Sequence, residues 1–200
     1  NTSPQSAQQS DQKAGVDQNW YAKVTQDVAK SEYFIRYQNE SKTYQSPNRS
    51  QNLRITYGDK GFTMTPRVQA KNPWQVALTL TSVTKGAGQL PLDTPFLDAQ
   101  ENHITSNYSH LTIEYLNNPE GMRQNFIVKS KPAGDKSLKL TLATSGSLSP
   151  VLKGNDAVLF AEKGHPANGV VWYKDLHVWD ANNVKLAAKM EVHGDAIDLV

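Results

Sequence analysis

The chain has 200 residues, 38% of them hydrophobic and 20% charged, and its formal net charge is +2 at pH 7. This composition is typical of a globular protein that buries a core rather than of a disordered chain. The 21 basic and 19 acidic residues are interleaved, so no clustered basic stretch favours nucleic acid, and no apolar run is long enough to span a membrane. The lack of cysteine excludes disulfides, thiolate metal sites and cysteine nucleophiles.

The amino-terminal stretch is almost wholly Asn, Gln, Ser, Thr and Ala up to residue 12, and the chain begins Asn1-Thr2-Ser3 without a methionine. Such a start is typical of a mature end left by signal-peptide removal, with trimming of the chain as the alternative. Together with the absence of cysteine, it favours a secreted bacterial protein. Residues 1–15 are expected to form a flexible polar leader, and residues 16–200 the folded module.

Apolar residues recur every four positions after this leader, at Val16, Trp20, Val24 and Val28. Asp17 stands where it can cap the start of a helix. The spacing therefore predicts one short amphipathic helix.

From residue 33 onward the hydrophobic period drops to two, which is typical of strands with one buried face. Strands are expected over 33–37, 53–57 and 74–80, and the Gly-Asp-Lys-Gly stretch at 58–61 predicts a hairpin into Phe62 and Met64. Residues 86–107 are rich in Gly, Pro and Asp, and we expect either a surface excursion or a seam between two subdomains there.

The second half of the chain repeats this alternation. A strand over 111–115 leads through the Asn-Asn-Pro-Glu-Gly turn at 117–121 into 122–128. Asn182 and Asn183 suit a tight hairpin between strands at 170–179 and 184–192. Further strands are expected over 138–142, 158–161 and 197–200.

These elements amount to about ten strands and one helix, with turns roughly every 8–15 residues and no βαβ alternation. The sequence therefore predicts an all-β, mainly antiparallel fold with one short N-terminal helix. A β-sandwich is expected, as one unit or as two packed β subdomains. The predicted core consists of Leu53, Ile55, Tyr57, Trp74, Val76, Leu78, Leu80, Leu111, Ile113, Phe126, Val128, Leu138, Leu140 and Leu142.

The five histidines lack the spacing of metal ligands, and solvated or hydrogen-bonded imidazoles are the expected reading. The sequence thus predicts no catalytic residue, no metal site and no cofactor. Calcium is the ion excluded least firmly, and Asp93, Asp98 and Glu101 in the 86–107 stretch are the first residues to consider for it.

A second candidate is the pair Asp175 and His177, which would share a face if they lie on one strand. No serine or threonine stands in a strained glycine-flanked turn beside it, so a hydrolytic site is not favoured. Water-facing strand residues are the simpler interpretation.

Exposed aromatic side chains are the remaining candidate. Trp172 and Trp179 are seven residues apart, so on one regular strand they face opposite sides, and at most one of them enters the core. An exposed tryptophan could stack on sugar rings. The segment 44–49 (YQSPNR) is expected to be a shaped corner that joins two strands, and Arg49 in it could meet an acidic group. The candidate ligand-binding residues are therefore Trp172, Trp179, Asp175, His177 and Arg49.

Three segments resemble one family when taken together. They are 44–49 (YQSPNR) followed by 52–54 (NLR), 114–126 (EYLNNPEGMRQNF) and 173–181 (YKDLHVWDA). They resemble the N-terminal β-rich domain of large secreted and cell-surface proteins of Bacteroidota, which precedes FG-GAP or PKD-like repeats. The resemblance implies export, often by the type IX route, and downstream domains of the same protein as partners. It implies no catalytic residues.

The leading functional expectation is a non-catalytic structural or adhesive module at the N-terminal end of a larger secreted bacterial surface protein. Its partners would be those downstream domains, with surface glycans or other extracellular proteins as further candidates. The alternative is a carbohydrate-binding module that uses exposed aromatic side chains. An enzyme ranks third, because no nucleophile, metal or phosphate motif is present.

Overall fold

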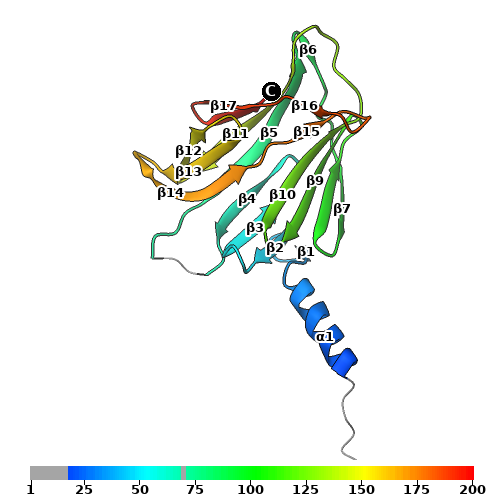
Figure 1. Ribbon diagram of the computed structural model, residues 1–200, viewed down its shortest axis with the longest axis vertical. Helices are drawn as coiled ribbons and strands as arrows, with labels where there is room; N and C mark the ends of the chain where they lie inside the picture. Colours follow the sequence, from blue (N-terminus) through cyan, green and yellow to red (C-terminus); the bar gives the residue numbers. More distant parts are fainter. Residues whose placement is uncertain (1–17, 69–70) are drawn as a thin grey trace, which may run out of the picture.

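A computed structural model describes residues 18–68 and 71–200, in which antiparallel strands dominate and one helix precedes them (Figure 1). The prediction of a mainly antiparallel all-β fold with a short N-terminal helix is confirmed. The proposed leader over 1–15 lies outside the described residues.

The helix α1 spans Gln18–Ser31. The strands are β1 Arg36–Gln38, β2 Thr43–Asn48, β3 Leu53–Tyr57, β4 Gly61–Pro66, β5 Val76–Lys85, β6 Gly88–Gln89, β7 Phe96–Gln100, β8 His103–Asn107, β9 Leu111–Asn118, β10 Gly121–Val128, β11 Leu138–Gly146, β12 Leu148–Lys153, β13 Ala157–Glu162, β14 His165–Lys174, β15 Val178–Trp179, β16 Lys185–Leu186, β17 Met190–His193 and β18 Ala196–Leu199.

The largest sheet has the order β1-β2-β3-β4-β5-β11-β18-β17, and β6 also pairs with β5. Its first strands follow chain order, and the expected hairpin is present with Tyr57 opposite Phe62. The corner expected over 44–49 is wrong, because residues 43–48 form β2; its buried side chains, Ser46 and Asn48, are polar and show no hydrophobic alternation. Between β5 and β11 the chain forms the strands of the second sheet, and between β11 and β17 it forms those of the third sheet and of a short two-stranded ribbon. Strands far apart in sequence therefore complete this sheet.

A second sheet has the order β10-β9-β8-β7. The predicted turn after residue 116 is confirmed, since Asn118 pairs with Gly121 across it. The stretch 86–107, expected as a surface excursion or a subdomain seam, is not one long loop, because β6, β7 and β8 lie in it. Alternation did not reveal β7, since Phe96 and the residues after it are exposed or only half-buried on both faces.

A third sheet, β12-β13-β14, follows β11, and β15 with β16 forms a separate short ribbon. The predicted strand over 170–179 is interrupted: β14 ends at Lys174, and Asp175 adopts a φ of 64°. A positive φ takes the chain out of extended structure. The predicted hairpin around Asn182 and Asn183 is present, with Trp179 paired to Lys185, but its strands are only two residues long.

One cluster of buried side chains joins the three larger sheets. Tyr115 on β9 packs edge-on against Tyr57 and Phe62 of the first sheet, with ring centroids 5.3 and 5.9 Å apart. Val158 and Phe160 of β13 are fully buried in the same cluster. The predicted core is largely confirmed, and its four half-buried members, Trp74, Phe126, Val128 and Leu138, pack against the cluster.

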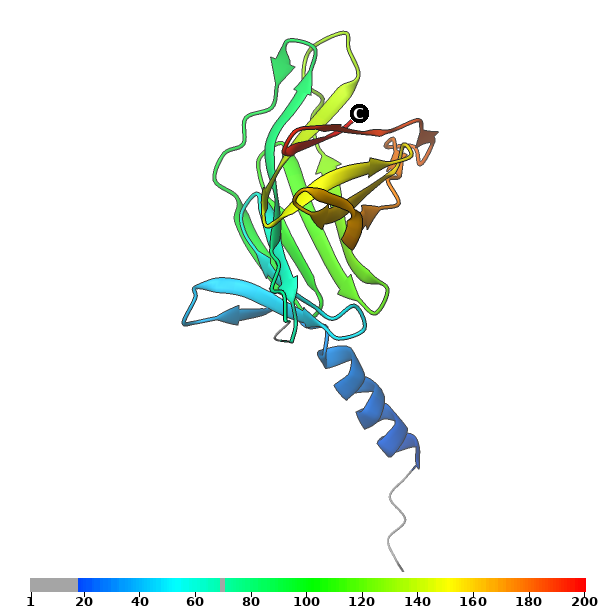
Figure 2. The same ribbon diagram turned by 90° about the vertical axis from the view of Figure 1, so that its left-hand side faces the viewer.

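The helix projects from the strands (Figures 1 and 2). Trp20, Val24 and Val28 on its apolar stripe are 59%, 38% and 58% exposed. The predicted helix is therefore present, beginning at Gln18, while its predicted residues Val16 and Asp17 lie outside the described range. No described helix has the length and apolar character needed to cross a membrane.

Candidate functional site

The two candidate tryptophans are both exposed. Trp172 on β14 is 50% exposed, and Trp179 on β15 is 57% exposed. The chain leaves extended structure between them, so they do not lie on one regular strand, and the expectation that at most one of them enters the core is met. Neither tryptophan belongs to the core, so both rings are open to a ligand.

Trp172 belongs to a small apolar surface on the outer side of the third sheet. It pairs with Leu159 on β13, which pairs in turn with Val151 on β12. Val170 is also exposed, but the register shifts there, since Phe160 pairs with Val171 and Ala161 pairs with Gly169, so Val170 does not continue the regular alternation. We call Val151, Leu159 and Trp172 the β14 face.

The inner side of this sheet explains why the β14 face is rigid. Val158, Phe160 and the half-buried Tyr173 point into the shared core. The Tyr173 hydroxyl donates to Oε1 of Gln124 at 3.0 Å, and Gln124 Nε2 donates to the Tyr115 hydroxyl at 3.3 Å. These contacts fix β14 to the second sheet, so the outer side chains are held on an ordered support.

The position of β14 also leaves one strand edge unpaired within the described chain. It is the outermost strand of its sheet, and residues 165–170 are all exposed. Pro166 lacks a backbone N–H, and the register shifts near Ala161, features that protect sheet edges against uncontrolled pairing. The regular part of the strand, from Val171 to Lys174, keeps its ladder with β13.

Asp175 and His177 do not form the predicted same-face pair, since both lie between β14 and β15 rather than on a strand. The Asp175 carboxylate lies 3.5 Å from Nζ of Lys174. The His177 ring instead packs against Trp179, with centroids 5.7 Å apart and planes tilted by 51°. His177 thus extends the aromatic surface at Trp179 and has no acid–base partner among the described residues.

Arg49 is separate from these residues. It follows β2, near the junction with α1, whereas the tryptophans lie on β14 and β15 (Figure 1). Its guanidinium donates to Oε1 of Glu32 at 2.9 Å. The expectation that Arg49 could meet an acidic group is met inside the chain, so this arginine is already paired.

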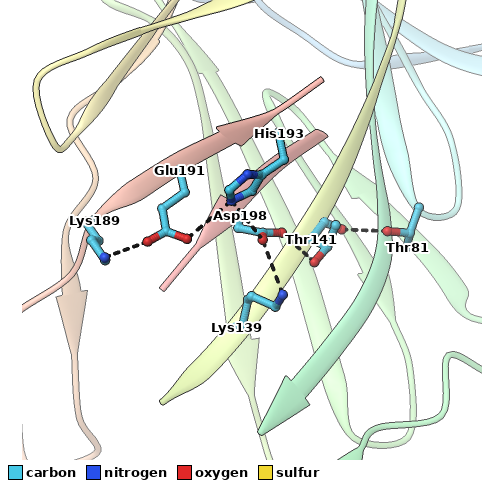
Figure 3. Close-up of polar contacts among 7 residues, drawn as sticks. All are labelled: Thr81, Lys139, Thr141, Lys189, Glu191, His193 and Asp198. Atoms are coloured by element: carbon cyan, nitrogen blue, oxygen red, sulfur yellow. Dashed lines mark hydrogen bonds and ion pairs between the residues drawn. The ribbon is translucent and has the colours of Figure 1, made fainter. Parts of the chain in front are cut away.

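A charged cluster that the sequence did not reveal lies at the β17 end of the first sheet (Figure 3). Nε2 of His193 is 3.5 Å from Oε2 of Glu191 and 4.0 Å from Oδ2 of Asp198. Glu191 and Asp198 are opposite one another in the β17–β18 pair. The three ligand atoms lie within 4.8 Å of one another, a size that could hold a metal ion.

Each of the two carboxylates in this cluster is also ion-paired with a lysine. Nζ of Lys189 lies 2.5 Å from Oε1 of Glu191, and Nζ of Lys139 lies 3.3 Å from Oδ2 of Asp198. Asp198 is almost fully buried, and its Oδ1 accepts a hydrogen bond of 2.6 Å from Thr141. A divalent cation here would have to displace Lys139 and add two positive charges to a balanced network. The cluster is best described as an ion network that ties β17 and β18 to β11.

The hydrogen bond from Lys189, followed by that from His193, lowers the pKa of Glu191 below its usual value. Glu191 therefore stays ionised, as the network requires. Sequence spacing could not find this group, because its members meet only through the register of three strands.

The three acidic residues considered for calcium do not form a site. Asp93 accepts a hydrogen bond of 2.5 Å from Ser109, which lowers the pKa of Asp93. Asp98 lies on β7 opposite Thr105, and Glu101 lies in the following turn. The Asp93 carboxylate is hydrogen-bonded to Ser109, and the three carboxylates do not come together in a group that could hold a metal ion.

Other histidines are hydrogen-bonded, as expected from the sequence. His103 Nε2 lies 2.9 Å from Oε1 of Glu114, and His110 Nδ1 lies 2.8 Å from the Ser130 hydroxyl. The absence of a catalytic metal stays a prediction.

A scan of protein-family models and searches of curated proteins and of solved structures found no match to this chain.

Proposed function

We propose that this chain is a non-catalytic adhesive module of a larger secreted bacterial surface protein, and that it makes contact through the β14 face. The observation that carries the proposal is the exposure of Trp172, beside Leu159 and Val151, on the outer side of a sheet whose inner side is packed into the core. Apolar side chains exposed on a rigid support are typical of interaction surfaces. The resemblance of three segments to Bacteroidota surface proteins is the reason for the proposed location.

The acid–base candidates support a binding role over an enzymatic one. Asp175 pairs with Lys174, and His177 packs on Trp179, so the two residues that could have formed a catalytic pair make separate contacts. Catalysis by such a pair requires the carboxylate to orient the imidazole.

The experiment measures retention of fluorescent beads carrying the chain on surfaces coated with solubilised extracellular-matrix protein. Trp172→Ala should reduce retention several-fold, because it removes the largest exposed side chain of the β14 face. Phe96→Ala is the matched control, since Phe96 is a 70% exposed aromatic residue on the second sheet. Equal retention of the Trp172 variant and the unmodified chain would contradict the proposal, and equal loss in both variants would indicate unspecific apolar adhesion.

A carbohydrate-binding module remains the second candidate, because Trp172 and Trp179 both expose their rings. Surfaces coated with neutral polysaccharides distinguish the two functions. If the chain binds polysaccharide but not matrix protein, and both Trp172→Ala and Trp179→Ala weaken that binding, the carbohydrate function is correct and the adhesive one is not.

A further inference from the structure

A pocket of about 170 Å³ lies between the end of α1 and the outer side of β1, β2 and β3. The β1–β2 hairpin, in light blue in Figure 2, lies above α1 in that view. Its residues Arg36, Gln38 and Gln45 line the pocket. Arg36 pairs with Gln45, and Pro47 pairs with Arg54, so the two arginines flank β2 from opposite sides. Strands two positions apart are about 10 Å from each other, and the offset of two residues along β2 puts the two Cα atoms roughly 12 Å apart, a span that two long arginine side chains can close around one ligand.

The pocket carries positive charge that the chain does not neutralise. Arg36 and Arg54 line it, and neither guanidinium has an ion-pair partner within the described residues. Arg49, a few residues away, is in contrast paired to Glu32. No acidic side chain lines the pocket. Arginine presents several N–H donors in a planar fork that matches a carboxylate.

The carbonyl groups at the C-terminal end of α1 do not repel an anion bound in this pocket. The last carbonyl groups of a helix carry partial negative charge when they lack donors. Here the Lys30 carbonyl accepts from the Tyr33 amide at 3.1 Å, and the Ser31 carbonyl accepts from the Phe34 amide at 3.3 Å. The Ser31 hydroxyl donates to the Val28 carbonyl at 2.8 Å. These carbonyls are therefore already satisfied.

The remaining lining groups indicate a ligand with hydroxyl groups. Gln38 and Gln45 line the pocket, and each uses its Nε2 within the chain while its Oε1 receives no hydrogen bond from the described residues. Amide oxygens accept hydrogen bonds from hydroxyls. Phe34 adds an apolar wall, and the Arg36 guanidinium lies 5.9 Å from its ring centroid. A carboxylate alone supplies no donor to these amide oxygens, whereas the hydroxyl groups of a sugar do.

We infer that this pocket binds one acidic sugar residue of a polysaccharide, with Arg36 and Arg54 holding its carboxylate and Gln38 and Gln45 accepting from its hydroxyls. The pocket is smaller than those that enclose drug-sized molecules, which fits a single sugar unit. The pocket lies in a different sheet from the β14 face. The inference therefore goes beyond the proposed function, and either of the two can be wrong while the other is right.

Isothermal titration calorimetry of the whole chain with oligogalacturonate tests the inference. Binding should be detectable, should weaken as salt is raised, and should fall by roughly tenfold or more in Arg36→Gln and in Arg54→Gln. Arg123→Gln is the matched control, because Arg123 is an exposed arginine on β10 of the second sheet. Circular dichroism and melting temperature show whether each variant is folded.

Four outcomes would overturn the inference. The uncharged galactose oligomer could bind equally well, or the Arg123 variant could lose as much affinity as the pocket variants. Acetate could match oligogalacturonate in affinity, which would indicate a simple anion site. Polyglutamate could bind with the same arginine dependence while oligogalacturonate does not, which would identify an acidic peptide as the ligand.

Discussion

At the scale of single residues, two asparagines connect the first and second sheets. Asn48 on β2 and Asn117 on β9 are completely buried. Asn48 Nδ2 donates to Asn117 Oδ1 at 2.8 Å, and Asn117 Nδ2 donates to the carbonyls of Tyr33 and Pro47 at 2.9 and 2.8 Å. A buried amide is tolerated because all its groups find partners. The segments 44–49 and 114–126 therefore meet at this contact.

Asn117→Ala should destabilise the chain by about 3 kcal/mol, because each buried polar group left unpaired costs roughly 1–3 kcal/mol. The measurement is the free energy of unfolding by urea titration. Asn182→Ala is the control, since Asn182 lies in an exposed turn and should change stability by about 0.5 kcal/mol or less. Similar effects of the two substitutions would show that the amide contact does not connect the sheets.

Glu114 offers a test of local electrostatics. Burial by itself would raise its pKa, but hydrogen bonds from Asn125 and His103, at 2.6 and 2.9 Å, outweigh this and lower the pKa. Ionised Glu114 thus stabilises the fold above the ordinary glutamate pKa, and this contribution is lost as the pH falls through the lowered folded-state value. Asn125→Ala should raise the Glu114 pKa, as measured by NMR titration of its carboxyl carbon. An unchanged pKa would contradict the assignment.

At the scale of elements, hydrophobic alternation predicted strands whose buried face is apolar, and it missed β2, whose buried side chains are Ser46 and Asn48. In β5, Val76, Leu78 and Leu80 are completely buried, while Thr79 and Thr81 between and after them are exposed. Alternation failed where no face is buried, as in β7, and where the chain turns by a positive φ, as at Asp175. Such a backbone change depends on the neighbouring sheet and has no hydrophobic period to indicate it.

The central strand β5 provides a stability prediction. Leu78→Ala should cost roughly 2–5 kcal/mol, the usual range for a truncated core leucine, because Leu78 is completely buried between β4 and β11. Leu152→Ala is the control, since Leu152 on β12 is 42% exposed and should cost about 1 kcal/mol or less. A loss below about 0.5 kcal/mol for Leu78→Ala in the same urea titration would contradict the placement of the core.

At the scale of the whole molecule, the candidate site could be predicted only in part. The sequence identified Trp172 and Trp179 as residues worth attention, but their shared exposure depends on how β14 ends. The network around Asp198 was not predictable, since its members come from β11, β17 and β18. Strand register across a sheet is a tertiary property that spacing along one strand does not contain.

The arrangement of sheets leads to the proposed adhesive surface. The first and second sheets bury the central cluster between them, and the third sheet contributes only its inner side to that cluster. Its outer side, with the edge strand β14, is left to solvent in the described chain. A rigid, exposed strand face is thus a direct consequence of how the chain is divided among the sheets.

Hydrogen exchange followed by mass spectrometry, on the chain free and bound to matrix-coated beads, tests adhesion through the β14 face most directly. Amides that become covered by a partner exchange more slowly. The account predicts slower exchange on binding in residues 165–174, with no change in β7 and β8 and with the difference absent in Trp172→Ala. Binding accompanied by protection confined to the second sheet, or by none in residues 165–174, would contradict it.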